Sequence, residues 1–141
     1  MTTTLSPYLN FRGNAREAME FYREVLGGEL YISTFKQFGA AADPSEDDLV
    51  MHADLHGAGG LHLLASDAPP RIEMREGSNF ALSLVGDSEP ELRAAFDRLA
   101  AGGTVSTPLA VAAWGAVFGM CTDRFGVRWL VNIDPRGAGG Q

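Results

Sequence analysis

The sequence has little of what marks secreted, membrane-spanning or nucleic-acid-binding proteins. Cys121 is the only cysteine among 141 residues, so no intramolecular disulfide can form, which favours a reducing compartment. No segment approaches the roughly 20 apolar residues of a membrane span, and the N-terminal segment lacks the pattern of a secretory signal. Acidic residues outnumber basic ones by 18 to 11. We therefore expect a cytoplasmic protein that binds neither a nucleic acid nor a membrane.

Motifs for common cofactors and nucleophiles are also missing. No Gly-x-Gly-x-x-Gly follows a predicted strand, and there is no phosphate-binding Gly-Lys-Ser/Thr loop or Gly-x-Ser-x-Gly turn. Cys121 is either a nucleophile or a small buried side chain, and we favour the second interpretation. We accordingly predict no cofactor from these patterns.

The chain does contain one pattern that occurs twice. Residues 13–28 and 87–103 each predict an amphipathic helix that ends in two glycines. Phe21 corresponds to Phe96 at an offset of 75 residues, the same offset that relates the two glycine pairs. Each helix also begins with a predicted capping box, Asn14 with Glu17 and Ser88 with Glu91.

Strand-like runs precede and follow each helix. They cover residues 5–11, 29–38, 49–55 and 61–65 in the first half, and 80–85, 104–111, 116–122 and 127–133 in the second. We predict an α+β fold in which a crossover helix joins each first strand to its neighbour. Two β-α-β-β-β modules, residues 5–66 and 79–134, would form a curved, partly open eight-stranded barrel-like sheet with helices outside, within one domain spanning 1–141.

The connecting segments complete this plan. Residues 67–77, with two prolines and several charges, predict the linker between the modules, and 135–141 predict a disordered tail. The loop 39–48 ends in an acidic cluster, which is typical of a solvated loop but also fits a lid over a ligand site.

Histidines on predicted strands are the first candidates for a functional site. Alternation places His62 opposite Leu61 and Leu63, so it should point into the cavity between the modules. There it is either a general base or hydrogen-bond donor to a ligand, or a neutral histidine satisfied by a neighbour. His52 is a similar candidate, with a structural or dimer-contact role as the alternative. His56, beside a glycine turn, is interpreted as an exposed turn residue.

Asparagines and aromatic residues supply the other candidates. Asn10, Asn79 and Asn132 fall on the polar side of strands, where a side chain meets either ligand or water. Trp114 lies where a strand begins and suits a cleft mouth or a dimer interface, whereas Trp129 predicts core packing. The predicted substrate-binding residues are Tyr8, Asn10, His52, His62, Asn79, Trp114 and Asn132, with His62 the best catalytic candidate.

Three segments carry a resemblance to a known family: residues 8–15 with Glu17, Ala18 and Phe21-Tyr22, then 51–55, then 114–129. Over residues 5–134 the chain resembles the vicinal oxygen chelate superfamily, also called glyoxalase/bleomycin resistance/dioxygenase, and within it the PhnB-like branch. The fold hosts many chemistries, so the resemblance implies an architecture more specifically than a reaction.

The resemblance also implies where a metal would bind. Metal-dependent members use two histidines and two glutamates, and the corresponding positions here are Ser6 or Pro7, His62, Asn79 and Leu130. Only His62 is a usual ligand, whereas a catalytic metal needs about three. We therefore predict no metal site of that kind, a divalent metal being possible only with an incomplete ligand set.

Two functions follow from the resemblance. The first is binding of a small, partly aromatic or amphipathic molecule in the inter-module cavity. The second is a small-metabolite enzyme of lyase, isomerase or dioxygenase type that uses a divalent metal or His62 as acid/base. By analogy with the family, we also expect a homodimer.

Overall fold

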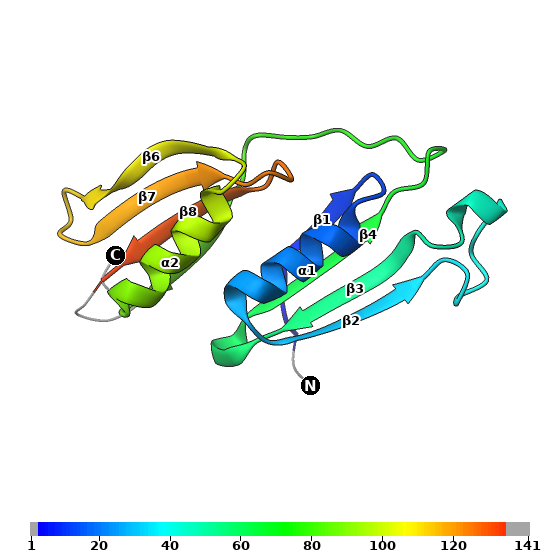
Figure 1. Cartoon of the computed structure of the whole chain (residues 1–141), viewed down its shortest axis with the longest axis horizontal. Helices are drawn as coiled ribbons and strands as arrows, with labels where there is room; N and C mark the ends of the chain where they lie inside the picture. Colours follow the sequence, from blue (N-terminus) through cyan, green and yellow to red (C-terminus); the bar gives the residue numbers. More distant parts are fainter. Residues whose placement is uncertain (1–2, 135–141) are drawn as a thin grey trace. The chain divides into compact units, whose positions relative to one another are not determined.

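The computed structural model describes residues 3–134. These residues divide into two compact units, with the boundary between Glu76 and Gly77. Each unit is a four-stranded sheet with one helix packed on it (Figure 1). No helix among the described residues is long and apolar enough to cross a membrane. The predicted disordered tail, 135–141, lies outside the described residues.

The first unit contains one complete β-α-β-β-β module. Its elements are β1 (Tyr8–Phe11), α1 (Ala15–Leu26), β2 (Glu29–Thr34), β3 (Val50–His56) and β4 (His62–Asp67). The strand order is β1-β4-β3-β2, with β1 and β4 parallel and the other pairs antiparallel. Because α1 leads from one edge of the sheet to the other, the expectation that it joins neighbouring strands was wrong.

The second unit repeats this topology. Its elements are β5 (Leu82–Gly86), α2 (Glu89–Ala100), β6 (Thr104–Val111), β7 (Val117–Thr122) and β8 (Arg128–Ile133), in the order β5-β8-β7-β6. The predicted α+β class with two β-α-β-β-β modules is confirmed. The eight strands belong to two separately hydrogen-bonded sheets.

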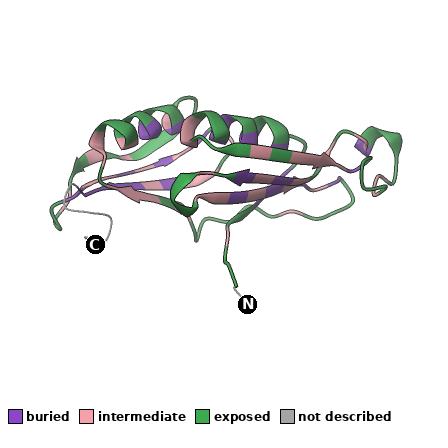
Figure 2. Ribbon diagram, turned by 90° about the horizontal axis from the view of Figure 1, so that it is seen from below, coloured by how far each residue is buried: buried purple, intermediate pink, exposed green. Residues whose placement is uncertain are grey.

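Each module has its core between the helix and one face of the sheet. Figure 2 shows buried residues on both the helices and the strands, with much of the helix surface exposed. The face of each sheet that points away from its own helix is called its open face. The buried side chains include Met19, Tyr22, Leu55, Leu63 and Ala65 in the first module and Phe96, Leu99, Trp129, Val131 and Ile133 in the second.

The helix N-termini are not capped as the sequence predicts. Asn14 and Ser88 occupy the N-cap positions, but neither side chain makes a capping hydrogen bond. Asp67 caps α1 instead: its Oδ1 accepts the backbone N–H groups of Gly13 and Ala15 at 2.9 and 3.0 Å. Its Oδ2 accepts the N–H of Val50 at 2.9 Å. Asp67 is thus the buried last residue of β4 and not the start of the linker.

The loop that precedes β3 is held in place by an ion pair. β2 ends at Thr34, four residues before the predicted Phe38, and a turn follows. Within the loop, Glu46 is buried, and its carboxylate accepts hydrogen bonds from Arg71 at 2.6 and 2.7 Å. The acidic segment is therefore anchored to the chain that leaves β4.

Candidate functional site

All three histidines of the chain gather around one carboxylate on the open face of the first sheet. In β3, His52, Asp54 and His56 alternate with the buried Ala53 and Leu55, so the polar side chains point away from α1. The register pairs His56 with His62 across the β3–β4 hairpin. Strand alternation and pairing together bring the polar groups into contact.

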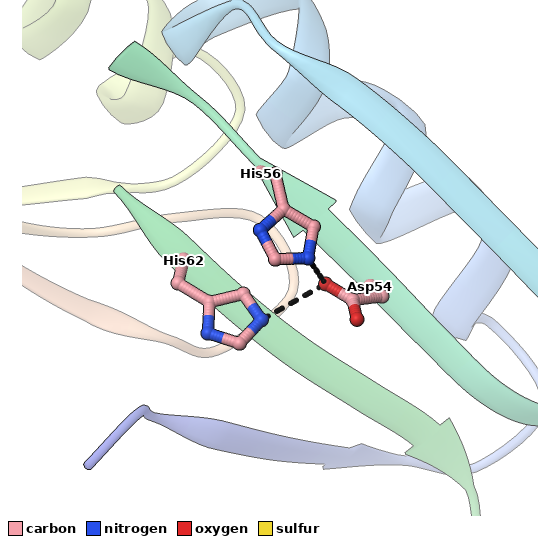
Figure 3. Close-up of side chains that lie close together, drawn as sticks. All are labelled: Asp54, His56 and His62. Atoms are coloured by element: carbon pink, nitrogen blue, oxygen red, sulfur yellow. Dashed lines mark hydrogen bonds and ion pairs between the residues drawn. The ribbon is translucent and has the colours of Figure 1, made fainter. Parts of the chain in front are cut away.

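The contacts converge on one oxygen atom. His56 Nε2 and His62 Nε2 lie 2.8 and 2.9 Å from Asp54 Oδ1, and Figure 3 shows both rings directed at this carboxylate. The two imidazole rings stack with their centroids 4.3 Å apart. His52 is more distant, with its Nε2 4.0 Å from Asp54 Oδ2. We call Asp54, His56 and His62 the Asp54 cluster.

Ser6 completes the surroundings of His62. Its Oγ lies 2.7 Å from His62 Nδ1, so both ring nitrogens of this histidine have protein partners. The side chains of His62 and Asp54 are each 26% exposed and that of His56 is 55% exposed, so solvent reaches the cluster. Two imidazoles and a carboxylate in this arrangement can move protons or hold a divalent cation.

Two members of the cluster were missed or misjudged from the sequence. Asp54 was not a candidate, and His56, predicted to lie in a turn, is the last residue of β3. The signal was the alternating polar pattern from His52 through Asp54 to His56, which predicts one strand face. For His62, the contacts agree with a histidine satisfied by neighbours, and its role toward a ligand stays a prediction.

Tyr8 and Asn10 lie on the open face of the same sheet. They alternate with the buried Leu9 on β1 and are exposed. The Tyr8 ring is tilted against that of His52, with centroids 6.3 Å apart. The predicted residues Tyr8, His52 and His62 therefore share one sheet face.

In the second unit, the structure brings Trp114 and Asn132 together. Trp114 Nε1 donates to Asn132 Oδ1 at 3.0 Å, and the indole meets Phe118 edge-on at 5.3 Å between centroids. Asn132 is only 4% exposed, and its Nδ2 has no hydrogen-bond partner among the described residues. Because an indole only donates, the bond to Trp114 determines which end of the amide is Oδ1 and leaves Nδ2 as the unsatisfied donor.

Asn79 is placed differently from the prediction. It precedes β5, which begins at Leu82 and not at the predicted Phe80, and its side chain is exposed. Strand alternation therefore does not decide where Asn79 points. It lies in the second unit, and its contact with a ligand stays a prediction.

Two further predictions concern buried side chains. Trp129 lies in the core as expected, and its Nε1 donates to Asp123 Oδ2 at 2.9 Å. Cys121 is buried, and the loss of solvation together with the charge of Asp123 raises the pKa of its thiol to about 11. A thiol of this kind is neutral near pH 7, which favours a packing role over a nucleophilic one.

Comparison with known proteins agrees with this architecture. Residues 4–131 match the family described as Glyoxalase/Bleomycin resistance protein/Dioxygenase superfamily. Protein YjdN of Escherichia coli is 34% identical over 140 residues, covering 92% of this chain and 94% of that one. The crystal structure of PA1353 from Pseudomonas aeruginosa is 41% identical with a TM-score of 0.81, covering 94% of this chain and 98% of that one. The PhnB protein from Bacillus cereus shares the fold at 23% identity and a TM-score of 0.76, covering 94% of this chain and all of its own. The chain therefore belongs to the glyoxalase/bleomycin resistance/dioxygenase superfamily.

Proposed function

We propose that this protein is a PhnB-like member of the superfamily that binds a small, partly aromatic or amphipathic molecule, without the usual two-His two-Glu metal site. The observation that carries the proposal is the buried Nδ2 of Asn132, which has no partner among the described residues. A buried, unsatisfied donor costs about 1–3 kcal/mol. A ligand oxygen that accepts from this amide would recover that energy.

The surroundings of Asn132 support an amphipathic ligand. On the open face, the register places Val85 on one side of Asn132 and Phe118 on the other. Trp114, 46% exposed, packs on Phe118 and is bonded to the same amide. Apolar walls around one oriented polar group are typical of small-molecule sites. The ligand would place an aromatic or apolar part against these side chains and a carbonyl or carboxylate oxygen at Nδ2.

A thermal-shift screen with aromatic carboxylic acids, aromatic amides and aromatic antibiotics tests the proposal. A compound at 100 times its dissociation constant should stabilise the protein by about 2.7 kcal/mol. It should also quench Trp114 fluorescence, and Trp114→Phe should lose that signal, with the buried Trp129 left as an internal reference. Asn132→Ala should weaken binding about tenfold or more. Asn14→Ala removes an exposed amide at the start of α1 that makes no capping bond, and it should leave binding unchanged. A panel without any stabilising compound, or equal affinity in Asn132→Ala, would contradict the proposal.

The second candidate function is a small-metabolite enzyme of lyase, isomerase or dioxygenase type. It is favoured by the chain of contacts from Ser6 through His62 to Asp54, which would orient His62 as an acid/base. A compound found in the screen that is converted to a product, with conversion lost in His62→Gln but binding retained, would support this candidate over simple binding.

We also propose that the protein is cytoplasmic and acts as a homodimer. Both statements rest on the sequence and on the family, and the homodimer is tested below at the scale of the whole molecule.

A further inference from the structure

We propose that Asp54, His56 and His62 together bind one divalent transition-metal ion of the zinc, nickel or cobalt type. This ligand set differs from the two-His two-Glu set of the superfamily. Of the four positions that correspond to that set in this chain, only the one at His62 holds a usual metal ligand. Two of the three ligands come from β3. The site lies in the first unit and is independent of the small-molecule proposal, which concerns Asn132 in the second.

The donor atoms are already close enough to share one ion. Both Nε2 atoms lie within 2.9 Å of the same carboxylate oxygen, and the three ligand atoms all lie within 4.8 Å of one another. Around a tetrahedral ion with bonds of about 2.0–2.1 Å, neighbouring ligand atoms are about 3.3 Å apart. Small side-chain rotations would therefore replace the two contacts to Asp54 by three bonds to a cation.

Ser6 supplies the support that a metal-binding histidine usually has. Its Oγ lies 2.7 Å from His62 Nδ1. If Nδ1–H donates to this oxygen, the imidazole is in the tautomer whose Nε2 carries a lone pair for a metal. Hydrogen bonds to the other ring nitrogen of metal-binding histidines select this tautomer. The stacked rings and the direct pairing of His56 with His62 on adjacent strands limit the rearrangement that binding needs.

The chemistry of the donors indicates the kind of ion. Two imidazoles and one carboxylate suit zinc, nickel and cobalt, whereas calcium and magnesium prefer all-oxygen sets. Three protein ligands leave at least one position for water or another ligand, and the exposed side of His56 gives access to it. His52 has its Nε2 4.0 Å from the other oxygen of Asp54 and is not part of the set, which makes it a matched control.

The test uses the full chain without a histidine tag, freed of metal with a chelator and dialysed. Cobalt(II) is titrated in while its visible absorption is recorded, and zinc is added to displace it. We expect saturation at one cobalt per chain. Loss of a ligand should weaken binding on the order of 100-fold or more in each of three variants: Asp54→Asn, His56→Ala and His62→Ala. Ser6→Ala removes a hydrogen bond that supports a ligand, and it should weaken binding on the order of 10-fold, the lower end of the range for such supporting residues.

Controls separate this site from other sources of affinity. His52→Gln removes an imidazole from the same face, Cys121→Ser removes the only thiol, and both should bind cobalt as the parent does. Asn132→Ala should also bind cobalt normally, so a failed metal site and a failed small-molecule site give different results. Circular dichroism and the thermal midpoint, both measured without metal, show whether each variant is folded. Asparagine keeps the shape of the aspartate side chain, so Asp54→Asn tests the site even where an alanine variant does not fold.

Three results would overturn the proposal. They are the absence of saturable cobalt binding up to millimolar concentrations, unchanged affinity in folded Asp54→Asn and His56→Ala, and loss of binding in Cys121→Ser. The first would mean that the Asp54 cluster is a hydrogen-bonded group only, and the others would place the metal elsewhere.

Discussion

Burial determines the chemistry of the single cysteine. The thiol of Cys121 lies in the core of the second module, and desolvation, with the charge of Asp123, raises its pKa to about 11. At pH 8 only about one molecule in a thousand carries the thiolate. We expect the native protein to react with a disulfide reagent at least 100-fold more slowly than the urea-unfolded chain. Equal rates, measured from the colour of the released thiol, would show that the side chain is accessible.

A single carboxylate connects three parts of the first module. Asp67 accepts backbone N–H groups at the start of α1 and from Val50 at the start of β3. In Asp67→Asn, the NH₂ group replaces one carboxylate oxygen, so a donor would face a backbone N–H that needs an acceptor. We therefore expect the free energy of unfolding to fall by about 2–3 kcal/mol. The measurement is urea unfolding. The exposed Asp97→Asn is the control, expected to change stability by less than about 0.5 kcal/mol. A stable Asp67→Asn variant would mean that the capping contacts contribute little.

The glycine pair that ends each helix has two separate tasks. Gly27 and Gly102 adopt the left-handed region, with φ of +78° and +80°, and so allow the helix to end. The second glycine permits a close approach: a Cβ on Gly28 would lie 2.2 Å from the carbonyl oxygen of His56, and one on Gly103 2.0 Å from that of Thr122. In both modules, the second glycine therefore packs against the last residue of the third strand, so the sequence repeat is matched by a repeated contact.

This difference predicts how alanine substitutions behave. Gly102→Ala should cost about 1–2 kcal/mol, the penalty for the left-handed conformation. Gly103→Ala should cost more, because backbone atoms must move. Chemical denaturation ranks the stabilities of the two variants, and the reverse order would show that the backbone around Gly103 relaxes easily.

In the first module, Gly28→Ala should also weaken cobalt binding, because it displaces His56.

The loop before β3 should respond to acid. The hydrogen bond from Arg71, followed by that from the Ala42 N–H, lowers the pKa of Glu46 below its usual value of 4.5. A lowered pKa means that the stabilisation is complete above pH 4.5 and is lost as the pH falls through the folded-state pKa. We expect the thermal midpoint of Arg71→Gln to lie below that of the parent at pH 7, and the difference between the two midpoints to shrink as the pH falls below 4.5. A difference that does not depend on pH would contradict this.

At the scale of the whole molecule, the proposed homodimer can be measured directly. One chain has a mass of 15.1 kDa, so light scattering after size exclusion should give about 30 kDa at micromolar concentration. The result should be independent of added cobalt, because the proposed metal site uses ligands from one chain only. A mass near 15 kDa across the peak would refute the dimer.

The local features of this fold could be read from the sequence. The two helices, their glycine ends, most strands and the duplicated plan follow from periodicity and backbone preferences, which act between residues close in the chain. The same alternation correctly placed Trp129 in the core and His62 on the face opposite Leu63. These signals are local, so they can be interpreted without knowing which strands pair.

Contacts between distant segments were decided only by the tertiary structure. Strand order and register bring Ser6 to His62 across 56 residues and pair His56 with His62, and no periodic pattern encodes which strands become neighbours. For the same reason Asp67, which resembles a linker residue, becomes the cap of α1. Composition and alternation determined which side chains face away from the helices. The hydrogen-bonded register determined which of them meet, and so assembled the Asp54 cluster.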